Sequence, residues 1–159
     1  KGAGFEVDHD PIRPAVGYRF DWEGRSVVLS GDTAASTNLS ENAKGADVLV
    51  TESLVPALIG MAQKQMQAQN NPRAAKVMGD IPDYHISPVD AAKMANEAGI
   101  GLLVYSHHIP SIQVNSPMYF AGVAAVRPTD KWVAGWDGLR VDLPVGSTEI
   151  KQSELLPKP

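Results

Sequence analysis

One aspartate, one glutamate and three histidines stand next to expected strand ends or helix starts: Asp32, Glu52, His85, His107 and His108. Carboxylate oxygens and neutral imidazole nitrogens together suit zinc, manganese or iron, and a site that keeps a water position open would be hydrolytic. Each residue also has a plainer interpretation, because aspartate often caps turns and histidine is often half-exposed at a strand end. Residue types and spacing alone therefore make a metal site one hypothesis among several.

Other catalytic chemistries lack their sequence signatures. The chain has no cysteine, which excludes disulfides, cysteine nucleophiles and thiolate metal sites. It has no G-x-S-x-G segment and neither of the two common glycine-rich phosphate-binding segments. A formal net charge of -4 argues against a broad electrostatic contact with nucleic acid or anionic membrane. No apolar run is long enough to span a bilayer, so we expect a soluble chain, cytoplasmic or periplasmic.

The strands that would position these residues are short apolar segments. Residues 15–30 predict a hairpin, because alternating and then continuous apolar positions flank a turn at 22–25. Residues 47–53 and 100–108 predict buried strands, and residues 131–144 predict a second hairpin that turns at "WDGL". Most of the five polar side chains therefore lie at or just beyond the end of a strand.

Helices are expected between the strands. Residues 38–45 predict a short helix that ends at a glycine, and residues 54–80 predict two helices interrupted at "NNP". The strongest helix signal covers 87–99, with serine as N-cap and proline at the first helical position. This alternation favours one α/β domain over residues 1–150, followed by a flexible tail at 151–159. Because strand ends meet at one edge of such a sheet, we expect the polar side chains to converge.

Two long segments resemble a known family. "GYRFDWEGRSVVLSGDTAASTNLSENAKGADVLVTES" and "DYHISPVDAAKMANEAGIGLLVYSHHIPS" are similar, in order, to the carboxyl-terminal half of the metallo-β-lactamase-fold hydrolases, in the branch that contains ribonuclease Z and arylsulfatase-like enzymes. The resemblance implies half of an αββα sandwich, with a mixed sheet flanked by helices. It also implies hydrolysis of phosphodiester, sulfate-ester or related ester bonds by a hydroxide held on two divalent metal ions, zinc first, with manganese or iron as alternatives.

The resemblance also implies roles for single residues. The aspartate of the family's "SGDT" segment bridges the two metals, which implies that Asp32 is the bridging ligand. The histidine that closes a later strand binds the second metal, and the matching residue is His107. His85 matches a loop histidine that contacts the substrate phosphate and protonates the leaving group, and Glu52 matches the acid that orients it. Thr51 stands where ribonuclease Z carries a histidine, which weakens a specific assignment to that enzyme.

Three further residues are expected at the substrate pocket. His9 matches a histidine that precedes the "GYR" strand, and a structural hydrogen bond there is its alternative role. Thr33 directly follows the expected bridging ligand. His108 stands where relatives carry apolar or aromatic residues, so we expect it to form a pocket wall or to support the ligands.

The family's main ligand cluster, an H-x-H-x-D-H segment, does not occur in the chain. We therefore expect this chain to be the carboxyl-terminal half of a longer hydrolase and to be inactive, or nearly so, alone. Its partner would be the missing amino-terminal half, and the uncovered apolar sheet face would favour dimers. Two alternatives stay open: a non-catalytic binding or assembly domain derived from this fold, and a ribonuclease Z-like RNA endonuclease. The substrate, a small-molecule ester or a phosphodiester, is not fixed by the sequence.

Overall fold

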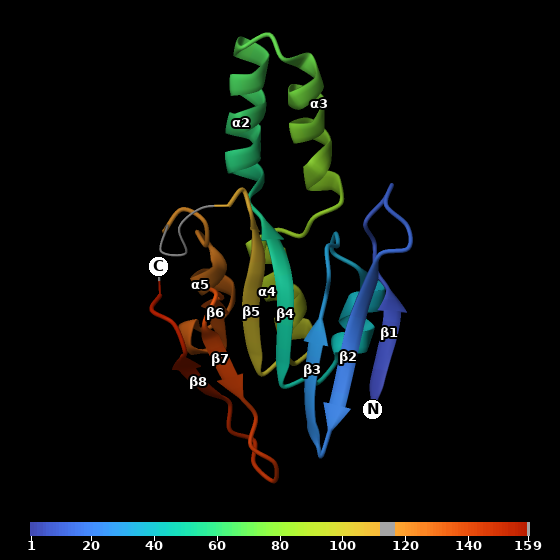
Figure 1. Cartoon of the computed structure of the whole chain (residues 1–159), viewed down its shortest axis with the longest axis vertical. Coiled ribbons are helices and arrows are strands. Elements are labelled where there is room, and N and C mark those ends of the chain that lie inside the picture. The colour runs from blue at the N-terminus through green and yellow to red at the C-terminus, as the bar shows by residue number, and fades with distance from the viewer. Residues whose placement is uncertain (112–116, 159) are drawn as a thin grey trace.

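A computed structural model describes residues 1–111 and 117–158, and its centre is a six-stranded mixed sheet (Figure 1). The strands lie side by side in sequence order, antiparallel from β1 to β3 and parallel from β3 to β6. They are β1 (Gly2–Glu6), β2 (Val16–Trp22), β3 (Arg25–Leu29), β4 (Val48–Leu54), β5 (Leu102–Ile109) and β6 (Trp132–Ala134). The α/β class, the mixed sheet and the first expected hairpin are thus confirmed.

Two helices, α1 (Thr37–Ala43) and α4 (Pro88–Glu97), pack on one face of this sheet. Ser36 and Ser87 cap them by accepting hydrogen bonds from backbone N–H groups of the first turn, as expected for serine at that position. The main apolar core lies between these helices and the sheet. The remaining short helices are α5 (Val123–Val126) and the 3-10 turns η1 (Ile81–Asp83) and η2 (Thr129–Lys131).

The segment after β4 forms a helical pair, α2 (Pro56–Ala68) and α3 (Pro72–Asp80), which confirms the expected two helices. Each begins with a proline, and the Asn71 side chain caps α3 by accepting from the Ala74 N–H. The two helices pack against each other and project beyond the sheet (Figure 1). They stand at the end of the sheet where β4 finishes, which is the end that carries the candidate site.

The other sheet face is partly covered by a two-stranded antiparallel sheet of β7 (Leu139–Asp142) and β8 (Lys151–Glu154). Val141 and neighbouring apolar side chains pack on Val48, Leu102 and Val104 of the central strands. The expected hairpin at 131–144 is therefore wrong, because β6 pairs with β5 in the large sheet whereas β7 pairs with β8. The expected flexible tail likewise begins with a strand, because backbone hydrogen bonds to β7 order residues 151–154.

The rest of this second face is uncovered and aromatic. Tyr18, Phe20 and Trp22 alternate along β2 and are 46%, 48% and 71% exposed. The register pairs Phe20 with Val27 and Tyr18 with Leu29, so these aromatic side chains lie on the face that carries the β7–β8 sheet. We call the uncovered part of this surface the β2 face. Among the described residues, no helix combines the length and apolar character needed to cross a membrane.

Candidate active site

Asp32 lies just beyond the end of β3, where two residues turn the chain. The Ser30 N–H donates to the Val50 carbonyl at 2.9 Å and so continues the pairing with β4. Gly31 then adopts φ +64°, and a Cβ at this position would lie 2.7 Å from the Val16 carbonyl oxygen. Only glycine combines this conformation with this close approach at little cost. The tight turn leaves the Asp32 side chain half-exposed at the edge of the sheet.

Asp32 is paired with His107 across the edge of the sheet. His107 Nδ1 lies 2.8 Å from Asp32 Oδ1, and the two side chains are 54% and 42% exposed. The two expected metal ligands, which are 75 residues apart in the chain, are therefore neighbours. A carboxylate oxygen and an imidazole nitrogen meet at an accessible position.

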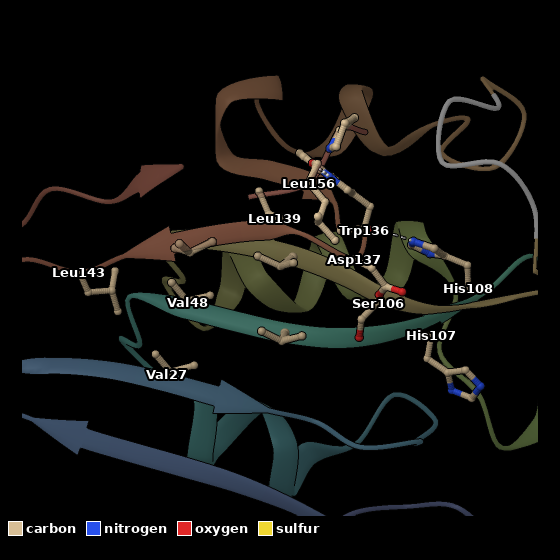
Figure 2. Close-up of a pocket in the computed structure, with 15 residues that line it drawn as sticks. Val27, Val48, Ser106, His107, His108, Trp136, Asp137, Leu139, Leu143 and Leu156 are labelled. Carbon is tan, nitrogen blue, oxygen red and sulfur yellow. Dashed lines mark hydrogen bonds between the residues drawn. The ribbon is translucent and has the colours of Figure 1, made fainter. Parts of the chain in front are cut away.

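His107 reaches this position because β5 bulges beside β4. The register runs from Thr51 opposite Tyr105 to Ser53 opposite His108, so two residues of β5 lie opposite Glu52 alone. His107 has φ +39°, a backbone conformation that is uncommon for any residue other than glycine. A bulge redirects side chains that would otherwise alternate strictly across the sheet. Figure 2 shows the rings of His107 and His108 pointing away from each other.

Glu52 and His85 form a second pair, which is buried. Glu52 Oε1 lies 2.7 Å from His85 Nδ1, and the two side chains are 1% and 8% exposed. The same oxygen accepts the backbone N–H of Thr33 at 2.7 Å, whereas Oε2 is buried with no hydrogen-bond partner among the described residues. Because Nδ1 of His85 donates to this carboxylate, its Nε2 is the nitrogen left for chemistry.

The two pairs lie next to each other, and His9 stands beside them. The ring centroids of His85 and His107 are 6.4 Å apart, and those of His9 and His85 are 4.9 Å apart. His9 Nδ1 donates to the Tyr84 carbonyl at 2.8 Å, so His9 holds the backbone next to His85. Three of the four histidines therefore line up along this edge of the sheet, His85 in the middle.

Thr33 and His108 lie outside the row formed by His9, His85 and His107. The Thr33 residue is fully buried and its hydroxyl donates to the Ala34 carbonyl at 2.8 Å, so its link to the site is the N–H that holds Glu52. His108 lines a cavity of about 760 Å³ whose walls include Val50, Trp136 and Leu139. Its Nε2 donates to the Gly135 carbonyl at 3.2 Å, and burial lowers the pKa of His108, which favours the neutral ring.

The exposed pair of Asp32 and His107 offers the types of donor atom that divalent metals bind. Asp32 supplies oxygen and His107 supplies nitrogen, the ligand types that zinc and related ions take from proteins. Glu52 is engaged elsewhere, because its Oε1 accepts hydrogen bonds from His85 and from the Thr33 N–H. Within residues 1–111 and 117–158, no three histidine, aspartate or glutamate side chains are grouped closely enough to hold a metal ion alone.

Comparisons with known proteins bear on the fold and the family. No family model matches the chain. The solved metallo-β-lactamase fold protein YhfI from Bacillus subtilis superimposes with a TM-score of 0.54 at 18% sequence identity, over 80% of this chain and 43% of its own. A putative ribonuclease Z of Mycobacterium tuberculosis is 34% identical over 137 residues, 86% of this chain and 56% of its own length. Ribonuclease Z of Mycobacterium avium is 35% identical over 119 residues, 75% and 39% of the two chains.

The structural match, together with the mixed sheet and its helices, shows that this chain has the metallo-β-lactamase fold. Within that fold, the chain is similar in sequence to mycobacterial proteins named ribonuclease Z. The chain spans about half the length of the curated relatives it matches.

The structure also adds residues that sequence reasoning missed. Tyr119, which belongs to no recognised motif, and Ser53, to which the motifs assign no role, both contact His108. Trp136 and Asp137 line the cavity, although the sequence suggested only a turn there. No spacing rule signals contacts of this kind, because they depend on how distant segments pack.

Proposed function

We propose that the complete protein is a metal-dependent hydrolase of phosphodiester or related ester bonds, and that this chain contributes part of its active site. The observation that supports this most directly is the pairing of Asp32 with His107 beside that of Glu52 with His85. Accessible donors suited to a metal thus adjoin a buried, oriented imidazole. A non-catalytic binding domain would not need both arrangements at one edge of the sheet.

Asp32 and His107 would hold the metal, and further ligands would come from the part of the protein that precedes this chain. Divalent ions, when bound, would supply an activated water and polarise the ester. His85, protonated on both ring nitrogens, would donate its Nε2 proton to the leaving oxygen and keep its Nδ1 proton, a role in which a positioned histidine commonly contributes about 10²–10⁴-fold in rate. Glu52 would accept the Nδ1–H and so hold the His85 ring in that orientation. His9 would fix the loop that carries His85 through the Tyr84 carbonyl.

RNA is the second candidate for the substrate. The likeness to proteins named ribonuclease Z favours it. The net charge of -4 favours a small-molecule ester instead, because nucleic-acid binding draws on positive charge. Sulfate esters form the third class to compare, since a tetrahedral anion of similar size would fit the same donors.

The missing amino-terminal half would also explain the β2 face. Phe20 and Trp22 expose large apolar surfaces. They lie on the same sheet face as β7 and β8, which cover only part of it. We propose that the preceding part of the protein packs there as the second layer of the sandwich.

This chain alone would then form dimers through the β2 face, and a double variant Phe20→Ser, Trp22→Ser would be monomeric by light scattering. A wild-type chain that is monomeric would contradict this.

Activity of the complete protein tests the proposed function. Hydrolysis of bis-p-nitrophenyl phosphate, p-nitrophenyl sulfate, a lactone and a 3′-extended RNA should separate the substrate classes. On the preferred substrate, His85→Asn should lower kcat by about 10²-fold or more with little change in KM. Glu41→Gln, an exposed carboxylate on α1, is the control and should leave kcat unchanged. An unchanged kcat in His85→Asn would overturn the assignment of the proton donor.

A further inference from the structure

The β5 bulge that presents His107 is closed by a side chain from another segment. Beyond the bulge, Ile109 lies opposite Leu54, and its carbonyl accepts the Val55 N–H at 2.9 Å, as a parallel ladder requires. The matching bond from the Ile109 N–H would go to the Ser53 carbonyl. A side-chain hydroxyl group also lies within hydrogen-bond distance of both the Ile109 nitrogen and the Ser53 carbonyl oxygen.

The hydroxyl is that of Tyr119. It accepts the Ile109 N–H at 2.7 Å and donates to the Ser53 carbonyl, so it links β5 to β4 directly beyond the bulge. The Tyr119 side chain is 2% exposed, and burial raises the pKa of its phenol, so the group remains a donor. A buried hydroxyl that bonds two backbone groups is a fixed link between them rather than a chance contact.

Neighbouring residues hold the Tyr119 hydroxyl group in place. The Ser53 hydroxyl lies 3.2 Å from both Tyr119 Oη and His108 Nδ1. Since His108 donates from Nε2 to Gly135, its Nδ1 accepts from the Ser53 hydroxyl, and the single Tyr119 proton goes to the Ser53 carbonyl. The His108 and Tyr119 rings also pack edge to face, 5.3 Å apart. Ser53, which follows Glu52, and His108, which follows His107, are thus joined through Tyr119 in one network.

We propose that Tyr119 is a positioning residue for the metal ligand His107, because its hydroxyl maintains the bulge that turns His107 toward Asp32. This proposal rests on the proposed metal site. Without the hydroxyl, the Ile109 N–H and the Ser53 carbonyl lose a partner that ties them together. The strand pairing next to the bulge is then weaker, and so is the support for the positive φ of His107. His108, which packs on Tyr119, then acts through the same network rather than as a ligand.

Tyr119→Phe in the complete protein tests this inference, because it removes the hydroxyl and keeps the ring. Zinc affinity is measured by competition with a chromogenic chelator, and Ile109 amide exchange is measured by NMR. We expect zinc binding at least about tenfold weaker, the size of effect that residues supporting a ligand produce, together with faster exchange of the Ile109 amide. The control is Ile100→Val, a mild core truncation just before the start of β5, which should leave zinc affinity within about twofold.

The outcomes separate this inference from the metal site on which it rests. Zinc affinity within twofold of wild type in Tyr119→Phe, or an Ile109 amide that exchanges as in wild type, would overturn the role of Tyr119. Equal losses of affinity in Tyr119→Phe and Ile100→Val would also overturn it, since the effect would then be one of general stability. Normal zinc binding by Asp32→Ala would instead refute the metal site itself.

Discussion

Replacing Glu52 probes the buried pair that holds His85, and the structure sets the size of the effect. In Glu52→Ala the buried Thr33 N–H loses its acceptor, which costs about 1–3 kcal/mol. The residue is 2% exposed, so removal of its side chain adds a cavity cost of about 1–2 kcal/mol. We therefore expect the free energy of unfolding of the complete protein to fall by about 3 kcal/mol, measured by urea denaturation.

Glu52→Gln is the informative comparison, because glutamine keeps one oxygen for the Thr33 N–H. Its NH₂ group would stand where Oε2 already has no partner, so the expected loss is about 1 kcal/mol or less. Glu41→Ala, which removes an exposed carboxylate, should change stability by no more than about 0.5 kcal/mol. Equal losses in the alanine and glutamine variants would refute the reasoning, because they would show that the hydrogen bond to Thr33 is not what matters.

Two further predictions concern the scaffold. Ser87→Ala should cost about 1 kcal/mol at neutral pH by removing the cap of α4. The Ser87 hydroxyl and then Lys93 lower the pKa of Asp90. The stabilisation from the Ser87–Asp90 hydrogen bond is therefore present above the usual aspartate pKa and should shrink as the pH falls below about 4. Urea titrations at pH 7 and pH 3 will show this difference. Arg127→Ala should cost about 3 kcal/mol in the same assay, because the buried guanidinium donates to Asn96 and Ile100. A loss below about 1 kcal/mol would contradict that account.

Local patterns were sufficient to predict the elements that bear on the site. The "SPVDAA" segment has its serine cap, its proline and an acid in the first turn, and α4 begins there. The apolar strands before Asp32 and through His107 were likewise evident, and the sheet places their ends together. The separate pairing of β6 and β7 was not predictable, because a hairpin signal reports on local turn residues and not on which sheet each strand joins.

The candidate site was only partly accessible to sequence reasoning. The resemblance drew attention to Asp32 and His107, and the structure brings their side chains within 2.8 Å. The bulge beside Glu52 could not be anticipated, since it arises from the register between two distant strands. Tyr119 could not be found either, because it follows no motif and acts through a single hydroxyl.

The metal content of the complete protein tests the central claim most directly. We predict two divalent ions per chain in the wild type by elemental analysis, and a sharp loss in both Asp32→Ala and His107→Ala. Asp90→Asn, which changes an exposed carboxylate on α4, should retain the wild-type content. Metal stoichiometry that is unchanged in the Asp32 and His107 variants would contradict the account.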